Sequence, residues 1–146
     1  MHTGSFDPVT LEGACHCGTV KFRAHLHHGL ASARRCTCSY CAMRGAVAVS
    51  SRVDGIEVLE GQAELGEYRF NTGVAKHYFC RNCGIYTFHQ RRSNPDEYGV
   101  NVACLDGLSP FDFPEVPVLD GQSHPSDRED GQTLRVGTLR FTRGSH

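Results

Sequence analysis

Apolar and polar residues alternate without interruption over Thr19–Leu26, the most regular pattern in the chain. One side of this pattern holds apolar residues and the other holds polar or charged ones; the apolar positions are Val20, Phe22, Ala24 and Leu26. A period of two residues is that of a β-strand with one buried face. The segment therefore predicts a half-buried strand that contributes every second side chain to the core.

Other short segments are rich in β-branched and aromatic residues and are bounded by Gly, Asn or Asp, which favour turns. They are 45–51, 55–61, 66–71, 74–80, 85–90, 97–105 and 133–141. Apolar residues do not repeat convincingly at helical spacing in any part of the chain. We therefore expect a mainly β fold.

The segment 108–130 is different, because Pro, Gly, Asp and Ser interrupt it too often for regular structure. We expect an ordered surface loop there, with a few apolar side chains packed on a sheet; they are Phe111, Phe113, Val116 and Val118. We interpret 1–143 as one domain with its core in about 13–107, and 144–146 as the remnant of an expression tag.

Composition limits the classes of function. The chain has 146 residues and a formal net charge of −1, which argues against a nucleic-acid binder that relies on a basic face. No stretch approaches the roughly 18 consecutive apolar residues that a membrane span requires, and the N-terminus does not resemble a secretion signal. We therefore expect a soluble cytoplasmic protein without a membrane or nucleic-acid partner.

The chain has eight cysteines, and seven of them are clustered. The clusters are Cys15/Cys17, Cys36/Cys38/Cys41 and Cys80/Cys83, whereas Cys104 stands alone in an apolar segment and is expected to be buried. Half-cystines one or two residues apart pair awkwardly with each other. Tight clusters in a reduced compartment favour metal binding over disulfides.

Seven cysteines divide naturally into four and three. Structural zinc takes four ligands, and catalytic zinc keeps three protein ligands with one exchangeable position. Cys15-x-Cys17 and Cys80-x-x-Cys83 would together make a closed structural site, which leaves Cys36, Cys38 and Cys41 for an open one. The spacing also allows Cys36 and Cys38 to join Cys80 and Cys83, with Cys41 as a spare thiol.

An ion held by three thiolates suits thiol chemistry better than water activation. A thiol that enters the fourth position loses its proton at neutral pH, because a coordinating thiol is deprotonated. It is then placed to attack an electrophile. A zinc nucleobase deaminase is excluded, because no Glu lies within 34–53 to act as its acid.

The ordered motifs resemble one family. They are GACHCGTVKF at Gly13–Phe22, CTCSYC at Cys36–Cys41, YFCRNCGIYTF at Tyr78–Phe88 and GVNVACLDG at Gly99–Gly107. In order and spacing they resemble glutathione-dependent formaldehyde-activating enzymes and their centromere protein V relatives. The resemblance implies a β-tent, in which twisted antiparallel sheets are clasped by zinc.

The resemblance also implies two zinc ions per chain. Cys15, Cys17, Cys80 and Cys83 would hold the structural one, and Cys36, Cys38 and Cys41 the catalytic one. The implied activity is that of S-(hydroxymethyl)glutathione synthase, a carbon–sulfur lyase in which a thiol such as glutathione adds to formaldehyde. The alternative is a non-catalytic, zinc-clasped binding module, as the centromere-associated relatives suggest.

Other residues near the cysteines are weaker candidates. Glutathione carries two carboxylates, and Arg44, three residues after Cys41, could contact one of them. His16 and His77 lie close in sequence to cluster cysteines and could donate a hydrogen bond to sulfur or act as a general acid, although we expect both on the outer face of strands. The sequence sets no oligomeric state.

Overall fold

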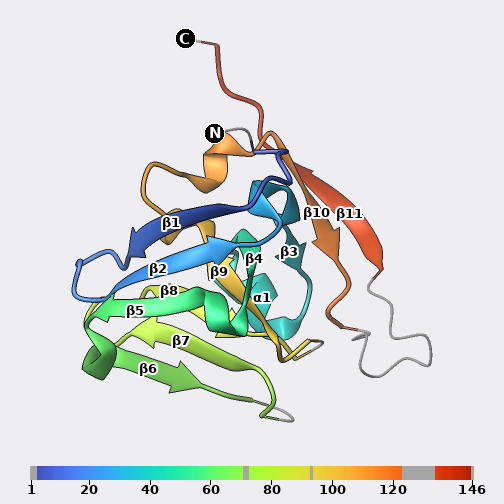
Figure 1. The fold of residues 1–146 in the computed structure, drawn as a ribbon. Coiled ribbons are helices and arrows are strands. Elements are labelled where there is room, and N and C mark those ends of the chain that lie inside the picture. Colours follow the sequence, from blue (N-terminus) through green and yellow to red (C-terminus); the bar gives the residue numbers. More distant parts are fainter. Residues whose placement is uncertain (1–2, 71–72, 93, 123–133, 146) are drawn as a thin grey trace.

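The computed structural model describes residues 3–70, 73–92, 94–122 and 134–145. Within these ranges the fold is mainly β, with three sheets and little helix, as the sequence pattern predicts (Figure 1). None of the helices in the described part of the chain has the length and apolar character needed to cross a membrane.

The first sheet is antiparallel and contains three strands in the order β1 (Val9–Ala14), β2 (Lys21–Leu26) and β5 (Ile56–Glu60). The alternation predicted for the β2 segment is confirmed, because its apolar side chains are fully buried and the intervening ones are exposed. The sequence pattern did not identify β1, because its only fully buried position is Gly13.

The second sheet has five strands, and each neighbouring pair is antiparallel. Its order is β4 (Ala48–Arg52), β9 (Glu97–Asn101), β8 (Tyr86–Gln90), β7 (Lys76–Cys80) and β6 (Leu65–Tyr68). The first two sheets share one apolar core, in which the rings of Phe22 in β2 and Phe88 in β8 meet edge to face at 5.4 Å. The core therefore lies between β2 and the middle of the large sheet.

The third sheet joins β3 (Arg35–Cys36), β10 (Glu115–Leu119) and β11 (Arg135–Arg140) in the order β11-β10-β3. The prediction of irregular structure throughout 108–130 is wrong for β10, whose Val116 is buried in the main core together with Phe113. Phe111 is exposed instead of packed. The part of that segment beyond 122 lies outside the described residues.

Short helices connect the strands. The α-helix is α1 (Ser39–Arg44), and the 3₁₀ turns are η1 (Gly29–Ser32), η2 (Val53–Gly55), η3 (Gln62–Glu64), η4 (Val102–Cys104) and η5 (Pro110–Asp112). A six-residue helix is too short to give a helical period in the sequence, which is why the pattern missed α1. The segment 97–105 is a strand only as far as Asn101, and η4 begins at the next residue.

Candidate metal centres

Four cysteines from two distant turns meet in one place. The sulfurs of Cys15, Cys17, Cys80 and Cys83, called here the four-cysteine cluster, all lie within 4.8 Å of one another. Cys17 Sγ is 3.6 Å from Cys15 Sγ and 3.8 Å from Cys80 Sγ. A tetrahedral ion with bonds of about 2.3 Å to sulfur separates its ligands by about 3.8 Å, so the donor set fits zinc.

Two strand connections build this cluster. Cys15 and Cys17 belong to the turn that joins β1 to β2, whereas Cys80 ends β7 and Cys83 lies in the turn that joins β7 to β8. Each turn contains a glycine with a left-handed φ, namely Gly18 at 80° and Gly84 at 79°. The cluster therefore fastens the first sheet to the large sheet at one end of the core.

The side chains that hydrogen-bond to Cys17 of the four-cysteine cluster are uncharged. Cys17 Sγ donates to Thr19 Oγ1 at 3.1 Å and accepts from the Asn82 amide at 3.2 Å. Hydrogen bonding with Thr19 and Asn82 lowers the pKa of that thiol to about 5. Burial raises the pKa of Cys80 to about 11. A buried thiol with a raised pKa ionises only when a cation offsets the desolvation, as a metal ion would.

A second group contains the other three clustered cysteines. The sulfurs of Cys36, Cys38 and Cys41, called here the three-cysteine cluster, also lie within 4.8 Å of one another. No other His, Cys, Asp or Glu of the described residues joins them. The structure thus groups the cysteines as four plus three, and it does not bring Cys36 and Cys38 to the Cys80/Cys83 pair.

Local structure explains how three nearby residues can point at one place. Cys36 ends β3, Cys38 is the N-cap of α1, and Cys41 lies in the first turn of that helix. The backbone N–H of Cys41 donates to Cys38 Sγ at 3.2 Å, and the backbone N–H of Cys38 is 3.5 Å from Cys36 Sγ. The sharp change from strand to helix therefore gathers the three sulfurs.

The electrostatics of the three-cysteine cluster favour a bound cation. Hydrogen bonds with Cys36 and Cys41 lower the pKa of the Cys38 thiol, and hydrogen bonds with Cys36 and Cys38 raise the pKa of the Cys41 thiol. One negative charge is therefore stable among the three sulfurs, and each further one is opposed by its neighbours. A divalent thiophilic ion removes this repulsion, so the donor set fits zinc here too.

Arg44 lies at the edge of the three-cysteine cluster, where the sequence placed a possible glutathione contact. Its guanidinium donates to Cys41 Sγ at 3.4 Å and to His77 Nδ1 at 3.0 Å. The same group lies over the rings of Tyr86, at 3.7 Å, and Tyr40, at 4.8 Å. Stacking between two rings fixes the cation beside sulfur.

His77 is buried, so the expectation that it lies on an outer face is wrong. Only 3% of it is exposed, and burial followed by the charge of Arg44 lowers its pKa to about 4. Because Nδ1 accepts the hydrogen bond from Arg44, the ring proton of the neutral imidazole is on Nε2, a buried atom with no hydrogen-bond partner among the described residues. His16, by contrast, is exposed.

An aromatic group surrounds this histidine. The ring of His77 lies 4.6 Å from Tyr40, 5.6 Å from Phe70 and 5.1 Å from His89, whose own Nδ1 is 2.6 Å from the Tyr86 hydroxyl. Sequence reasoning missed this arrangement, because the rings come from α1, β7, β8 and the segment after β6. No local spacing connects them.

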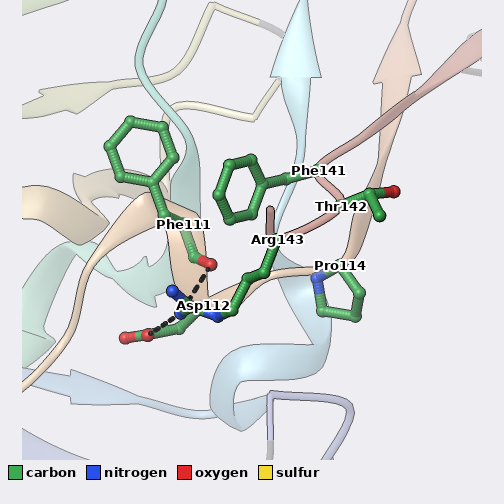
Figure 2. Close-up of a pocket in the computed structure, with 6 residues that line it drawn as sticks. All are labelled: Phe111, Asp112, Pro114, Phe141, Thr142 and Arg143. Atoms are coloured by element: carbon green, nitrogen blue, oxygen red, sulfur yellow. Dashed lines mark hydrogen bonds and ion pairs between the residues drawn. The ribbon is translucent and has the colours of Figure 1, made fainter. Parts of the chain in front are cut away.

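A separate surface recess lies away from this chemistry. Figure 2 shows the residues that line it, which are Phe111, Asp112, Pro114, Phe141, Thr142 and Arg143. The rings of Phe111 and Phe141 are 5.2 Å apart, and Arg143 donates to the carbonyl oxygen of Phe111. No cysteine or histidine lines this recess, so we place the chemistry at the cysteine clusters.

Comparison with known proteins identifies the family of the chain. A family model described as glutathione-dependent formaldehyde-activating enzyme matches residues 10–116, which include all seven cysteines of the two clusters. A crystal structure of a Rhodobacter sphaeroides protein is similar at 55% sequence identity and a TM-score of 0.73, covering 74% of this chain and 99% of that one. The chain therefore belongs to the family of glutathione-dependent formaldehyde-activating enzymes.

Proposed function

We propose that the chain is a zinc-dependent carbon–sulfur lyase of the S-(hydroxymethyl)glutathione synthase type. It adds glutathione or a related thiol to formaldehyde or a similar small electrophile at the three-cysteine cluster. The observation that carries the proposal is that three cysteine sulfurs lie within 4.8 Å of one another with no further metal-binding side chain of the described residues beside them. Such a donor set leaves room for one exogenous ligand.

The three-cysteine cluster would serve the reaction, and the four-cysteine cluster would stabilise the fold. A zinc ion at Cys36, Cys38 and Cys41 would supply a positive centre that lowers the pKa of an incoming thiol and holds its sulfur near the aldehyde. A second ion at Cys15, Cys17, Cys80 and Cys83 would stabilise the fold, because its site is absent from the unfolded chain. Two zinc ions per chain are therefore expected.

The reaction conserves atoms without an oxidant or reductant. The thiol loses its proton, its sulfur forms a bond to the carbonyl carbon, and the carbonyl oxygen takes up a proton, so that RSH and CH₂O give RSCH₂OH. The guanidinium of Arg44 favours the thiolate form of the nearby sulfur. The hydrogen bond to neutral His77 and the stacking on Tyr86 hold that guanidinium in place.

Arg44 is also our candidate contact for a carboxylate of glutathione. Its charge lies within hydrogen-bonding distance of Cys41 Sγ, so a thiol bound at the cluster brings the rest of its molecule close to this cation. The contact accounts for a preference for an acidic thiol over a neutral one of similar size.

The test compares the wild type with Cys38→Ser. Bound zinc is measured first, and formation of S-(hydroxymethyl)glutathione is then followed at low formaldehyde against the uncatalysed addition. We expect acceleration by the wild type, and a rate equal to the uncatalysed one for Cys38→Ser with one zinc retained. Ser39→Ala, an exposed change next to Cys38, is the matched control and should behave as the wild type. A wild type that gives no acceleration indicates the non-catalytic binding module instead.

A further inference from the structure

The chain after β10 packs directly on the three-cysteine cluster. β10 runs parallel to β3, and this register places Leu119 opposite Cys36. The backbone N–H of Thr37 donates to the carbonyl oxygen of Leu119 at 3.1 Å, and the backbone N–H of Gly121 donates to Thr37 Oγ1 at 3.0 Å. The Gln122 side chain adds a longer contact, 3.5 Å, to the carbonyl oxygen of Thr37. Thr37, which lies between Cys36 and Cys38, therefore makes three contacts with this one segment.

Gly121 makes the closest approach in this segment. A Cβ atom at this position would lie 2.7 Å from the backbone nitrogen of Cys38 and 2.8 Å from Cys38 Cβ, and it would be closest to Cys36 Sγ. Contacts below 3.0 Å are essentially never seen for real Cβ atoms, so either the sulfur or the segment would have to move.

The backbone conformation does not explain this glycine. Gly121 does not have a left-handed φ, unlike Gly45 and Gly107. An L-residue could therefore adopt its φ angle. Only the nearness of the cysteines excludes a side chain. The glycine is thus explained by the site and not by a turn.

This contact also lies beyond the family pattern. The family model ends at residue 116, and the segment Leu119–Gln122 follows it. The motifs that identify the family therefore say nothing about which part of the chain covers Cys36.

We propose that Leu119–Gln122 is a fixed wall of the three-cysteine cluster, and that Gly121 is a positioning residue which sets where the sulfurs of Cys36 and Cys38 lie for a thiophilic divalent cation. The wall fills the space beside Cys36 Sγ, so an incoming thiol reaches the cluster from another side. This inference rests on the proposed function only in that the three cysteines hold a metal ion.

The test uses two glycine-to-alanine changes, one just after β10 and one in its neighbouring strand β11. Gly121→Ala adds a methyl group against the cysteines, whereas Gly137→Ala, in β11, adds one where no atom lies within 4 Å. Each full-length protein is loaded with Zn²⁺, and the affinity of both clusters is measured by competition with a chromophoric chelator. Co²⁺ loading gives the thiolate-to-metal absorption of each cluster as a second readout.

We expect Gly121→Ala to lower the affinity of the three-cysteine cluster by about 10–100-fold, the usual effect of a change next to metal ligands. Its Co²⁺ spectrum should change while the four-cysteine cluster and the melting temperature stay as in the wild type. Gly137→Ala should match the wild type in every readout. Equal affinity and equal spectra for the two variants would overturn the proposal.

A second variant tests the proposal if Gly121→Ala does not fold. Thr37→Val removes the oxygen that accepts the Gly121 N–H but keeps the size of the side chain. Weaker metal binding at the three-cysteine cluster supports the wall, and unchanged binding overturns it. These readouts need no turnover, so a wild type that binds metal without accelerating hydroxymethylglutathione formation contradicts the proposed function and leaves this result intact.

Discussion

The two cysteine clusters use the same ligand and differ in how the chain supplies it. The four-cysteine cluster takes two residues from each of two turns that are far apart in sequence, whereas the three-cysteine cluster takes all its residues from the single stretch Cys36–Cys41. A site of the first kind closes a long loop and links two sheets. A site of the second kind links little, so its loss leaves the sheets in place. This difference supports our proposal that one cluster serves the fold and the other the chemistry.

The side chains around the two clusters also differ. The side chains of Thr19 and Asn82, which hydrogen-bond to the four-cysteine cluster, are neutral, and no charged side chain hydrogen-bonds to its sulfurs in the described part of the chain. The three-cysteine cluster has the Arg44 cation at 3.4 Å from Cys41 Sγ, and a buried neutral histidine behind that cation. A fixed positive charge is of use where a substrate thiolate must form.

The largest expected effect separates the clusters by stability. Cys80→Ser breaks the four-cysteine cluster and should lower the free energy of unfolding by about 5 kcal/mol or more, because metal binding there is part of folding. Thermal and urea unfolding measure it. The control is Cys104→Ser, a buried cysteine outside both clusters whose hydrogen bond to the Tyr86 carbonyl oxygen a serine can also make. Equal stability of the two variants would contradict a structural role for the four-cysteine cluster.

The next largest expected effect is on the reaction rate and not on the stability of the fold. Arg44→Gln removes the cation beside Cys41 and should lower the rate of hydroxymethylglutathione formation by about 10–100-fold, with metal affinity reduced at the three-cysteine cluster only. Arg44→Lys keeps the charge but loses the planar group that stacks between two tyrosines, so we expect an intermediate rate. Arg140→Gln, at an exposed ion pair on β11, is the control. A full rate for Arg44→Gln would mean that the cation is structural.

A smaller effect depends on pH. Burial, followed by the charge of Arg44, lowers the pKa of His77 from the 6.5 of an unperturbed histidine to about 4. The unfolded chain therefore binds a proton between these values that the folded one does not, and stability falls as pH falls from about 6.5 to 4. The loss is on the order of 2–3 kcal/mol.

His77→Phe tests this pH dependence, because it keeps a ring in the aromatic group and cannot be protonated. Urea unfolding across pH 4–7 should show a shallower slope for the variant than for the wild type. Comparing the two proteins cancels the effect of acid on the cysteines, which both contain. Identical slopes would show that His77 is not buried in its neutral form.

The smallest effect returns to the four-cysteine cluster. Asn82→Ala removes one exposed amide donor to Cys17 Sγ, a hydrogen bond worth about 1 kcal/mol, so metal affinity there should fall by about fivefold or less. The rate of hydroxymethylglutathione formation should not change. Chelator competition and the activity assay measure the two quantities. A clear loss of activity would show that the clusters are coupled.

Local patterns predicted much of the fold. The period of two in β2 and the turn residues around β5, β7 and β8 depend on neighbours in the sequence, and those strands are found. Sequence reasoning missed β1 because apolar and polar residues alternate over only four positions there, and it missed β10 because a proline interrupts that strand. It missed α1 because six residues complete less than two turns of helix.

The sequence by itself determined the three groups of clustered cysteines and the family. Cysteine spacing is a local property, and the ordered clusters leave few ways to divide seven sulfurs. The tertiary structure alone decided what surrounds them. Arg44 contacts His77, and Gly121 lies against Cys36, only because segments that are distant in sequence lie side by side. Contacts between residues distant in sequence depend on how the sheets pack, and no periodicity within one segment contains that information.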